Sequence, residues 1–272
     1  MGVDASEKYV QEGMRNLRFT PLWFKMKCAR WIKKWRLLLL WYGPHTIYPT
    51  FASCSISPAF DAGAEHFKKY GWVFIENIFN EDFHRELVKN WPKKHHFDPP
   101  QEVEKKYNMG FKWRYDDVAP FRYSDPHQQY PMLVKLKEYL SSKEFCERMR
   151  TFNGANDEML FYSCILNDSG PGAEVVPHRD GIRNHPHAET VVNMIFFIDA
   201  TGGERSGGLT LSRDPELKEI LFEPTNLTNT CLIYNIMDDF YHGFPPIARG
   251  KFRLVITAQF CGKGFIEHQP KQ

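Results

Sequence analysis

Pro177-His178-Arg179-Asp180 is the segment from which the architecture of this chain is best predicted. In a β-strand, residues two apart point to the same side, so His178 and Asp180 can present an imidazole nitrogen and a carboxylate oxygen to one point. A third ligand must come from far along the chain and lie near in space. The candidate is His242, which is followed by Gly243. Two histidines and one carboxylate on one face of a metal ion form the arrangement that holds non-haem iron(II).

An arginine that follows His242 completes this pattern. The segment 245–250 contains Pro245, Pro246 and Gly250 and is typical of a turn, so we expect the next apolar stretch, 252–260, to run antiparallel. Arg253 then enters the same cavity, where a planar guanidinium can bind a carboxylate through two parallel hydrogen bonds. Three residues alternate with it and are expected on the same strand face: Val255, Thr257 and Gln259. A metal ion held by three such ligands keeps open coordination positions, which a chelating keto acid can fill. Thr257 is a candidate hydroxyl contact for that keto acid.

Short apolar stretches separated by turn signals extend outward from this segment over the whole C-terminal half. They cover residues 158–166, 174–178, 190–199, 208–212, 218–222, 230–236 and 252–261. The segment 167–172, Asn-Asp-Ser-Gly-Pro-Gly, is predicted to be a loop. Many short strands at this spacing indicate a β-sandwich or barrel. Because helical patterns precede the strands, we expect helices to buttress one face of a jelly roll.

The sequence predicts three regions: a basic helical extension at 1–57, a helical support and substrate-lid region at 58–157, and a β-rich catalytic core at 158–265. Within the second region, Asn80 is a predicted helix cap. Ser141 and Glu144 fit a capping box for a later helix.

Composition excludes several classes of protein. The net charge of +2 argues against a dedicated nucleic-acid binder. The 6 cysteines include no CxxC pair, so we expect reduced thiols in an intracellular, cytoplasmic protein. No apolar run approaches the ~20 residues that span a bilayer.

Residues 22–42 are predicted to form a basic, tryptophan-containing amphipathic helix. Two interpretations remain open: the helix packs on the catalytic domain, which we favour, or it makes peripheral contact with an anionic membrane. The chain begins Met1-Gly2 with Ser6, which fits the N-myristoylation pattern, although such short patterns often match by chance.

The C-terminal half resembles the 2-oxoglutarate/Fe(II) dioxygenase superfamily, and within it the prolyl-4-hydroxylase-like branch. The resemblance covers about residues 158–262 and rests on four segments: 177–180, Gly207-Gly208-Leu209, His242-Gly243 and 250–257. It implies a mainly β, α+β fold: a double-stranded β-helix (jelly roll, cupin-like) buttressed by N-terminal helices. It also implies Fe(II), O2 and 2-oxoglutarate, with ascorbate as a reductant, and release of succinate and CO2.

Further site residues are predicted from their places on strands and loops. Tyr162 and Asn193 are expected to line the barrel and to contact the keto acid, with sheet packing as the alternative for Tyr162. A set of residues is proposed to contact the substrate: Arg179, Arg183, Arg114, Arg122, Tyr123 and Gln259. We expect Arg179 to point away from the iron. His185 and His187 are alternative metal ligands, but they supply no carboxylate.

The predicted activity is oxidation of an unactivated C–H bond in a small, carboxylated or amino-acid-like metabolite. Hydroxylation is the default, with desaturation or oxidative cyclisation open. Halogenation is disfavoured, because related halogenases have a small residue in place of the carboxylate of Asp180. The alternatives are a prolyl-type protein hydroxylase and a non-catalytic cupin-like binding protein. The sequence does not indicate an oligomeric state.

Overall fold

The computed structural model describes residues 52–93, 108–114, 130–180, 185–201, 209–236 and 240–268, with only the backbone described at 108–114. The chain divides into two units, Met1–Thr50 and Phe51–Gln272, and every described residue belongs to the second. The predicted helix at 22–42 and the N-terminal acylation pattern lie outside the described residues.

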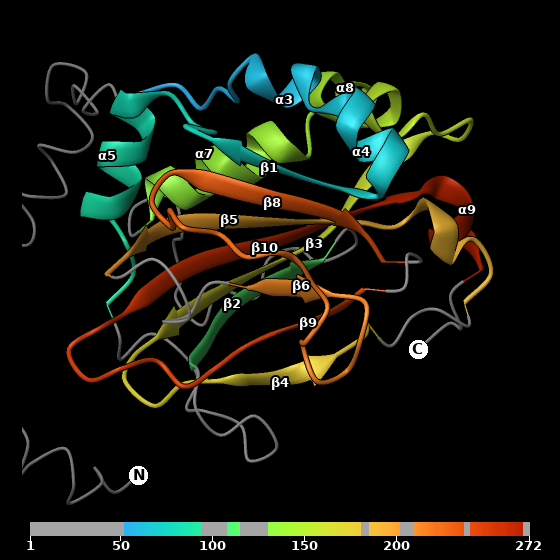
Figure 1. Ribbon diagram of the computed structural model, residues 1–272. Coiled ribbons are helices and arrows are strands. Elements are labelled where there is room, and N and C mark those ends of the chain that lie inside the picture. Colours follow the sequence, from blue (N-terminus) through green and yellow to red (C-terminus); the bar gives the residue numbers. More distant parts are fainter. Residues whose placement is uncertain are drawn as a thin grey trace, which may run out of the picture. The chain divides into compact units, whose positions relative to one another are not determined.

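Two antiparallel sheets form the centre of this unit (Figure 1). The larger sheet has the order β1-β8-β5-β10-β3-β2, with bounds β1 Trp72–Glu76, β8 Thr230–Asn235, β5 Val192–Ala200, β10 Arg253–Gly262, β3 Met159–Ser169 and β2 Asn108–Arg114. The smaller sheet has the order β4-β9-β6-β7, with bounds β4 Val175–His178, β9 Tyr241–Phe244, β6 Thr210–Ser212 and β7 Ile220–Phe222. This arrangement confirms the predicted jelly roll.

Helices cover the outer face of the larger sheet, as Figure 1 shows. They are α3 (Ala59–Ala62), α4 (Ala64–Tyr70), α5 (Glu81–Lys89), α7 (Pro131–Leu140) and α8 (Lys143–Asn153). The 3-10 turn η2 (Ala188–Thr190) and helix α9 (Lys263–Glu267) lie elsewhere in the chain.

The alternation of side chains along the strands of the larger sheet separates two hydrophobic cores. Met194 and Phe196 of β5 face the helices, whereas Ile195 and Phe197 face the smaller sheet. The space between the sheets is therefore a second apolar compartment.

Local sequence signals explain several helix ends. The Asn80 side chain accepts a hydrogen bond from Phe83 N at 2.8 Å and caps α5, as predicted. The cap of α8 is Ser142, not Ser141, and its hydroxyl accepts from Phe145 N. The predicted capping box is therefore wrong by one residue, because Glu144 occupies the second rather than the third helical position.

Two other expectations about β-structure need correction. The predicted loop at 167–172 begins too early, because Asn167 and Ser169 remain in β3 and pair with Val255 and Arg253 of β10. Long-range pairing with β10 overrides the local turn signal there. The segment Asn108–Arg114 has little sequence periodicity to mark it as a strand, but it forms β2, which pairs with β3.

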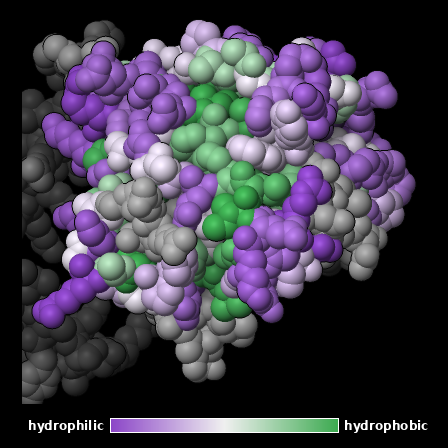
Figure 2. Space-filling model, in the orientation of Figure 1, coloured by the Kyte–Doolittle hydropathy of each residue, from purple (hydrophilic) through white to green (hydrophobic). Residues whose placement is uncertain are grey.

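On the face drawn in Figure 2, hydrophobic residues gather in a band through the middle, with hydrophilic residues on both sides. Among the described residues, the large hydrophobic side chains that are exposed are Tyr70, Val176 and Ile220.

The 5 described cysteines are free, and 4 of them are buried. Burial raises the pKa of the Cys231 thiol well above its usual value, so we expect this thiol to be unreactive and to serve in core packing.

Candidate metal centre

Three side chains meet at the end of the smaller sheet where β4 ends and β9 begins. Ligand atoms of His178, Asp180 and His242 all lie within 4.8 Å of one another. Among the described residues, this is the one group of three or more histidine, cysteine or acidic side chains that could hold a metal ion. The structure thus brings together the three residues that the sequence predicted as ligands.

Strand pairing explains why the two histidines meet. His178 of β4 is the register partner of His242 of β9, and their ring centroids lie 4.3 Å apart. A Cβ atom on Gly243 would lie 2.6 Å from the carbonyl oxygen of Val175, closer than such atoms approach. Glycine after His242 therefore lets β4 lie against β9 and bring both imidazoles to one place.

Each imidazole can present one nitrogen to a metal. The Nδ1–H of His178 donates to the carbonyl oxygen of Val176 at 2.8 Å, so Nε2 is the nitrogen that can coordinate. His242 is 5% exposed, and burial lowers its pKa to about 4. His242 is thus neutral at physiological pH, which is the form that coordinates a metal.

Two buried side chains fix the carboxylate of Asp180. The side-chain amide of Asn193 donates to Asp180 Oδ2 at 2.9 Å, and the hydroxyl of Tyr234 donates to the same oxygen at 3.2 Å. Asn193 also donates to the Tyr234 hydroxyl oxygen at 2.9 Å. Because both contacts use Oδ2, the other oxygen, Oδ1, remains 4.0 Å from His242 Nε2 and available to a shared ion.

Tyr234 was missed by sequence reasoning. It is 2% exposed, and burial, followed by the charge of Asp180, raises its pKa well above the usual range, so the phenol keeps its proton. The available signal was a tyrosine in the apolar strand 231–234, since a buried hydroxyl requires a partner. Asn193 carried the same signal; its observed contact is with the carboxylate of Asp180.

Arg253 lies deeper between the sheets. It is 5% exposed, and its guanidinium carbon lies 4.1 Å from the ring centroid of Phe244 and 5.6 Å from that of Phe197. Phe244 is two residues beyond His242 on β9, about 7 Å along an extended strand. The guanidinium is therefore buried in the barrel, and Arg253 stays the predicted ligand of a carboxylate.

Two polar atoms beside Arg253 are unsatisfied. Ser169 pairs with Arg253 across β3 and β10, and Asn167 pairs with Val255. Ser169 Oγ and Asn167 Oδ1 are buried, and neither has a hydrogen-bond partner among the described residues. Buried polar atoms usually have partners, and these two can both contact a polar ligand in this compartment. Sequence reasoning missed both, because it assigned them to a loop.

The other predicted residues are placed as follows. Thr257 and Gln259 lie on β10 opposite Ile195 and Asn193 of β5, and Gln259 accepts a hydrogen bond from Ser163 at 2.8 Å. The ring of Tyr162 lies 5.5 Å from that of Phe265, in ordinary aromatic packing. The guanidinium of Arg179 lies 4.2 Å from the ring centroid of Tyr241, whereas His242 follows on the opposite strand face, as expected for a side chain directed away from the cluster.

Several predicted residues lie outside the described part of the chain: Arg183, Arg122, Tyr123 and the side chain of Arg114. His185 and His187 are described, and they do not belong to the three-residue cluster. The ring of His185 packs 4.2 Å from that of Phe265, and His187 Nδ1 lies 3.7 Å from Glu189. They are therefore not ligands of this site.

A double-stranded β-helix with a histidine–aspartate–histidine cluster at the edge of its smaller sheet defines the class of protein. No protein-family model matches the sequence, and no curated protein matches it either. Solved structures do match, and the chain has the fold of 2-oxoglutarate- and Fe(II)-dependent oxygenases. The predicted resemblance to this superfamily is thus confirmed at the level of the fold.

Three of the matching solved structures show the level of similarity. A prolyl-4-hydroxylase from Pseudomonas putida has a TM-score of 0.55 at 15% identity, over 75% of this chain and 100% of that one. A Trichoplax adhaerens prolyl hydroxylase in complex with a hypoxia-inducible-factor peptide has a TM-score of 0.55 at 12% identity, over 78% and 93%. HygX from Streptomyces hygroscopicus, with nickel, 2-oxoglutarate and hygromycin B bound, has a TM-score of 0.52 at 9% identity, over 74% and 87%.

The described helices are also informative about membranes. In the described part of the chain, no helix is both long and apolar enough to cross a bilayer.

Proposed function

We propose that this chain is a 2-oxoglutarate-dependent Fe(II) oxygenase that oxidises an unactivated C–H bond in a small carboxylated or amino-acid-like metabolite. The observation that carries this proposal is the convergence of His178, Asp180 and His242 within 4.8 Å, on the fold that such oxygenases share. Hydroxylation is the reaction we expect, since the carboxylate of Asp180 leaves no halide position.

The residues present fit both groups. Two imidazoles and one carboxylate form a donor set that suits Fe(II) and leaves coordination positions open. The buried guanidinium of Arg253 and the unsatisfied Ser169 Oγ beside it suit the far carboxylate of 2-oxoglutarate. When bound, iron and 2-oxoglutarate supply the oxidising chemistry, in which O2 and the keto acid yield succinate, CO2 and an oxidised substrate.

The chain's own residues position these groups. His178, Asp180 and His242 would hold the metal, and Arg253 would bind the far carboxylate of the keto acid. Asn193 and Tyr234 fix Asp180 through hydrogen bonds to Oδ2 at 2.9 and 3.2 Å, so Oδ1 is the oxygen that can act as a ligand. The apolar walls formed by Ile195, Leu232 and Val255 exclude water from the compartment between the sheets.

Succinate release tests the proposal directly. Purified protein with Fe(II), 2-oxoglutarate and ascorbate is assayed against a panel of carboxylated metabolites, amino acids and proline-containing peptides. Stimulation by a small acid supports the proposal, whereas stimulation by peptides alone points to a protein hydroxylase. A protein that releases no succinate under any condition, with or without substrate, contradicts the oxygenase assignment.

Tyr234→Phe is expected to weaken metal binding about 10-fold, within the 10–100-fold effect of removing a hydrogen bond to a metal ligand. The reason is that Asp180 Oδ2 loses the donor at 3.2 Å and keeps only Asn193. Titration with Co(II), followed by its visible absorption, measures the affinity. Tyr241→Phe is the matched control and should bind as the wild type does; equal affinities in Tyr234→Phe and wild type would rule out this role.

Ser169→Ala is expected to weaken 2-oxoglutarate binding about fivefold, because a typical hydrogen bond contributes about 1 kcal/mol. The buried hydroxyl has no other partner among the described residues, so its loss should leave the fold stable. Isothermal titration of the metal-loaded protein with 2-oxoglutarate gives the affinity. An unchanged dissociation constant would remove Ser169 from the site.

A further inference from the structure

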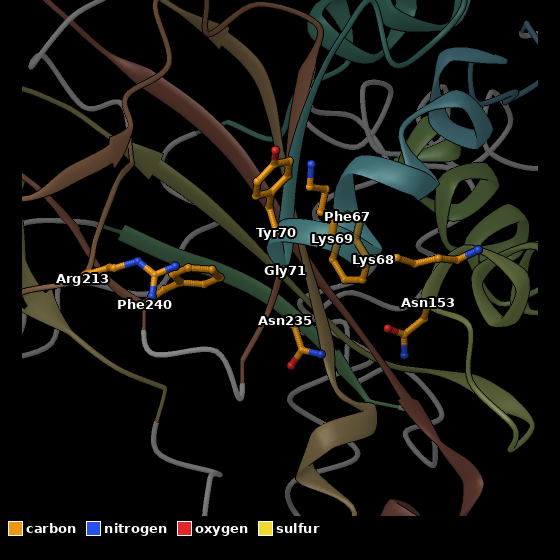
Figure 3. A pocket seen from close by; sticks show the side chains of 9 residues that line it. All are labelled: Phe67, Lys68, Lys69, Tyr70, Gly71, Asn153, Arg213, Asn235 and Phe240. Atoms are coloured by element: carbon orange, nitrogen blue, oxygen red, sulfur yellow. The ribbon is translucent and has the colours of Figure 1, made fainter.

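A cavity of about 400 Å³ lies where α4 leads into β1, and basic side chains line it (Figure 3). Its polar residues come from four separate parts of the chain: Lys68 and Lys69 of α4, Asn153 of α8, Arg213 after β6, and Asn235 of β8. Figure 3 shows Arg213 extending toward the cavity from the side opposite Lys68 and Asn153. The site is thus built by tertiary contacts rather than by one charged helix.

The lining carries positive charge, and its described members include no acidic residue. Lys68 Nζ lies 3.3 Å from Glu65, and Lys69 Nζ lies 4.9 Å from the ring centroid of Tyr70. Cations in the last turn of α4 are also favoured by the helix dipole, which accounts for the two lysines. That explanation does not extend to Arg213, whose side chain makes neither an ion pair nor a hydrogen bond with the described residues.

The cavity lies at the same end of the strands as the proposed metal centre. Phe240 lines the cavity and is 4% exposed, and His242 follows two residues later at the start of β9. Asn235, at the end of β8, also lines the cavity and follows Tyr234, whose hydroxyl donates to Asp180; the two side chains point to opposite faces of the sheet.

We propose, resting on the oxygenase function above, that this cavity binds the anionic group of the substrate, a carboxylate or a phosphate. Arg213 binds the anion with its planar guanidinium, and the charges of Lys68 and Lys69 add to the positive potential of the cavity. Arg213 is thereby a specificity-determining residue, outside the metal-binding machinery.

Anion binding to the metal-free, full-length protein tests this proposal without any turnover. The probes are inorganic phosphate and malonate, each titrated calorimetrically at low ionic strength. We expect millimolar or tighter binding that Arg213→Gln weakens about tenfold or more, as for loss of a charged hydrogen-bonding group.

One control variant makes the result specific. Arg249→Gln removes the same charge from the exposed turn before β10 and should bind both probes as the wild type does. Preference for phosphate or for malonate identifies the acid that the substrate carries.

Two outcomes overturn the proposal: no binding of either probe in the millimolar range, or equal binding by Arg213→Gln and wild type. Failure of the oxygenase function is distinguishable, because it removes succinate release while Arg213-dependent anion binding persists. Once a substrate is known, Arg213→Gln should raise the Michaelis constant for that substrate and leave the one for the keto acid unchanged.

Discussion

His178→Ala is expected to abolish metal-dependent succinate release, lowering it at least ~100-fold, since even loss of an outer contact to a metal ligand costs 10–100-fold. The cluster then keeps one imidazole and one carboxylate, too few ligands to hold ferrous iron firmly. Because His178 is exposed, its truncation leaves no buried cavity, and the thermal midpoint should stay close to that of the wild type. Assays of succinate and of bound iron on the same preparation check both statements.

The matched control for this experiment is His187→Ala. His187 lies between β4 and β5, is an alternative ligand by sequence alone, and is outside the cluster. The variant should keep full iron content and activity. Retained iron in His178→Ala, or iron lost from His187→Ala with His178 intact, would mean that the ligands are wrongly assigned.

Arg253→Ala is expected to weaken 2-oxoglutarate binding by about 2–5 kcal/mol, the usual effect of truncating one partner of a buried charge pair. That range corresponds to at least ~30-fold in Kd. Metal binding should be unchanged, because Arg253 stacks on Phe244 and lies deeper in the barrel than the cluster. Titration of the metal-loaded variant with 2-oxoglutarate measures the effect.

A second substitution separates binding from folding. Arg253 is buried between two aromatic rings, so alanine could also destabilise the sheet. Arg253→Lys keeps a cation but loses the paired donors, and it should bind 2-oxoglutarate with intermediate affinity. Wild-type affinity in a folded Arg253→Ala protein would show that the keto acid is held elsewhere.

The metal cluster was predictable from sequence because strand geometry constrains it. His178 and Asp180 are two residues apart, so one strand direction suffices to bring them together. The position of His242 followed from the turn and strand that come after it. Arg253 was predictable for the same reason, since an antiparallel return from the turn at 245–250 brings it back into the barrel.

Features that depend on pairing between distant segments were not predictable. Ser169 lies in a segment with strong local turn signals, and only its pairing with Arg253 keeps it in β3. Tyr234 became visible as a contact of Asp180 only once β8 and β5 were placed side by side. The cavity containing Arg213 is assembled from four parts of the chain, so no single sequence pattern marks it.

Whether His178, Asp180 and His242 bind ferrous iron together with 2-oxoglutarate is measured most directly by an anaerobic titration of the purified protein with Fe(II), followed by 2-oxoglutarate, under visible spectroscopy. We expect a weak charge-transfer band that appears only when both are present, saturates at one equivalent, and is absent in His178→Ala. A wild-type protein that binds Fe(II) and 2-oxoglutarate without such a band, or binds neither, would contradict this expectation.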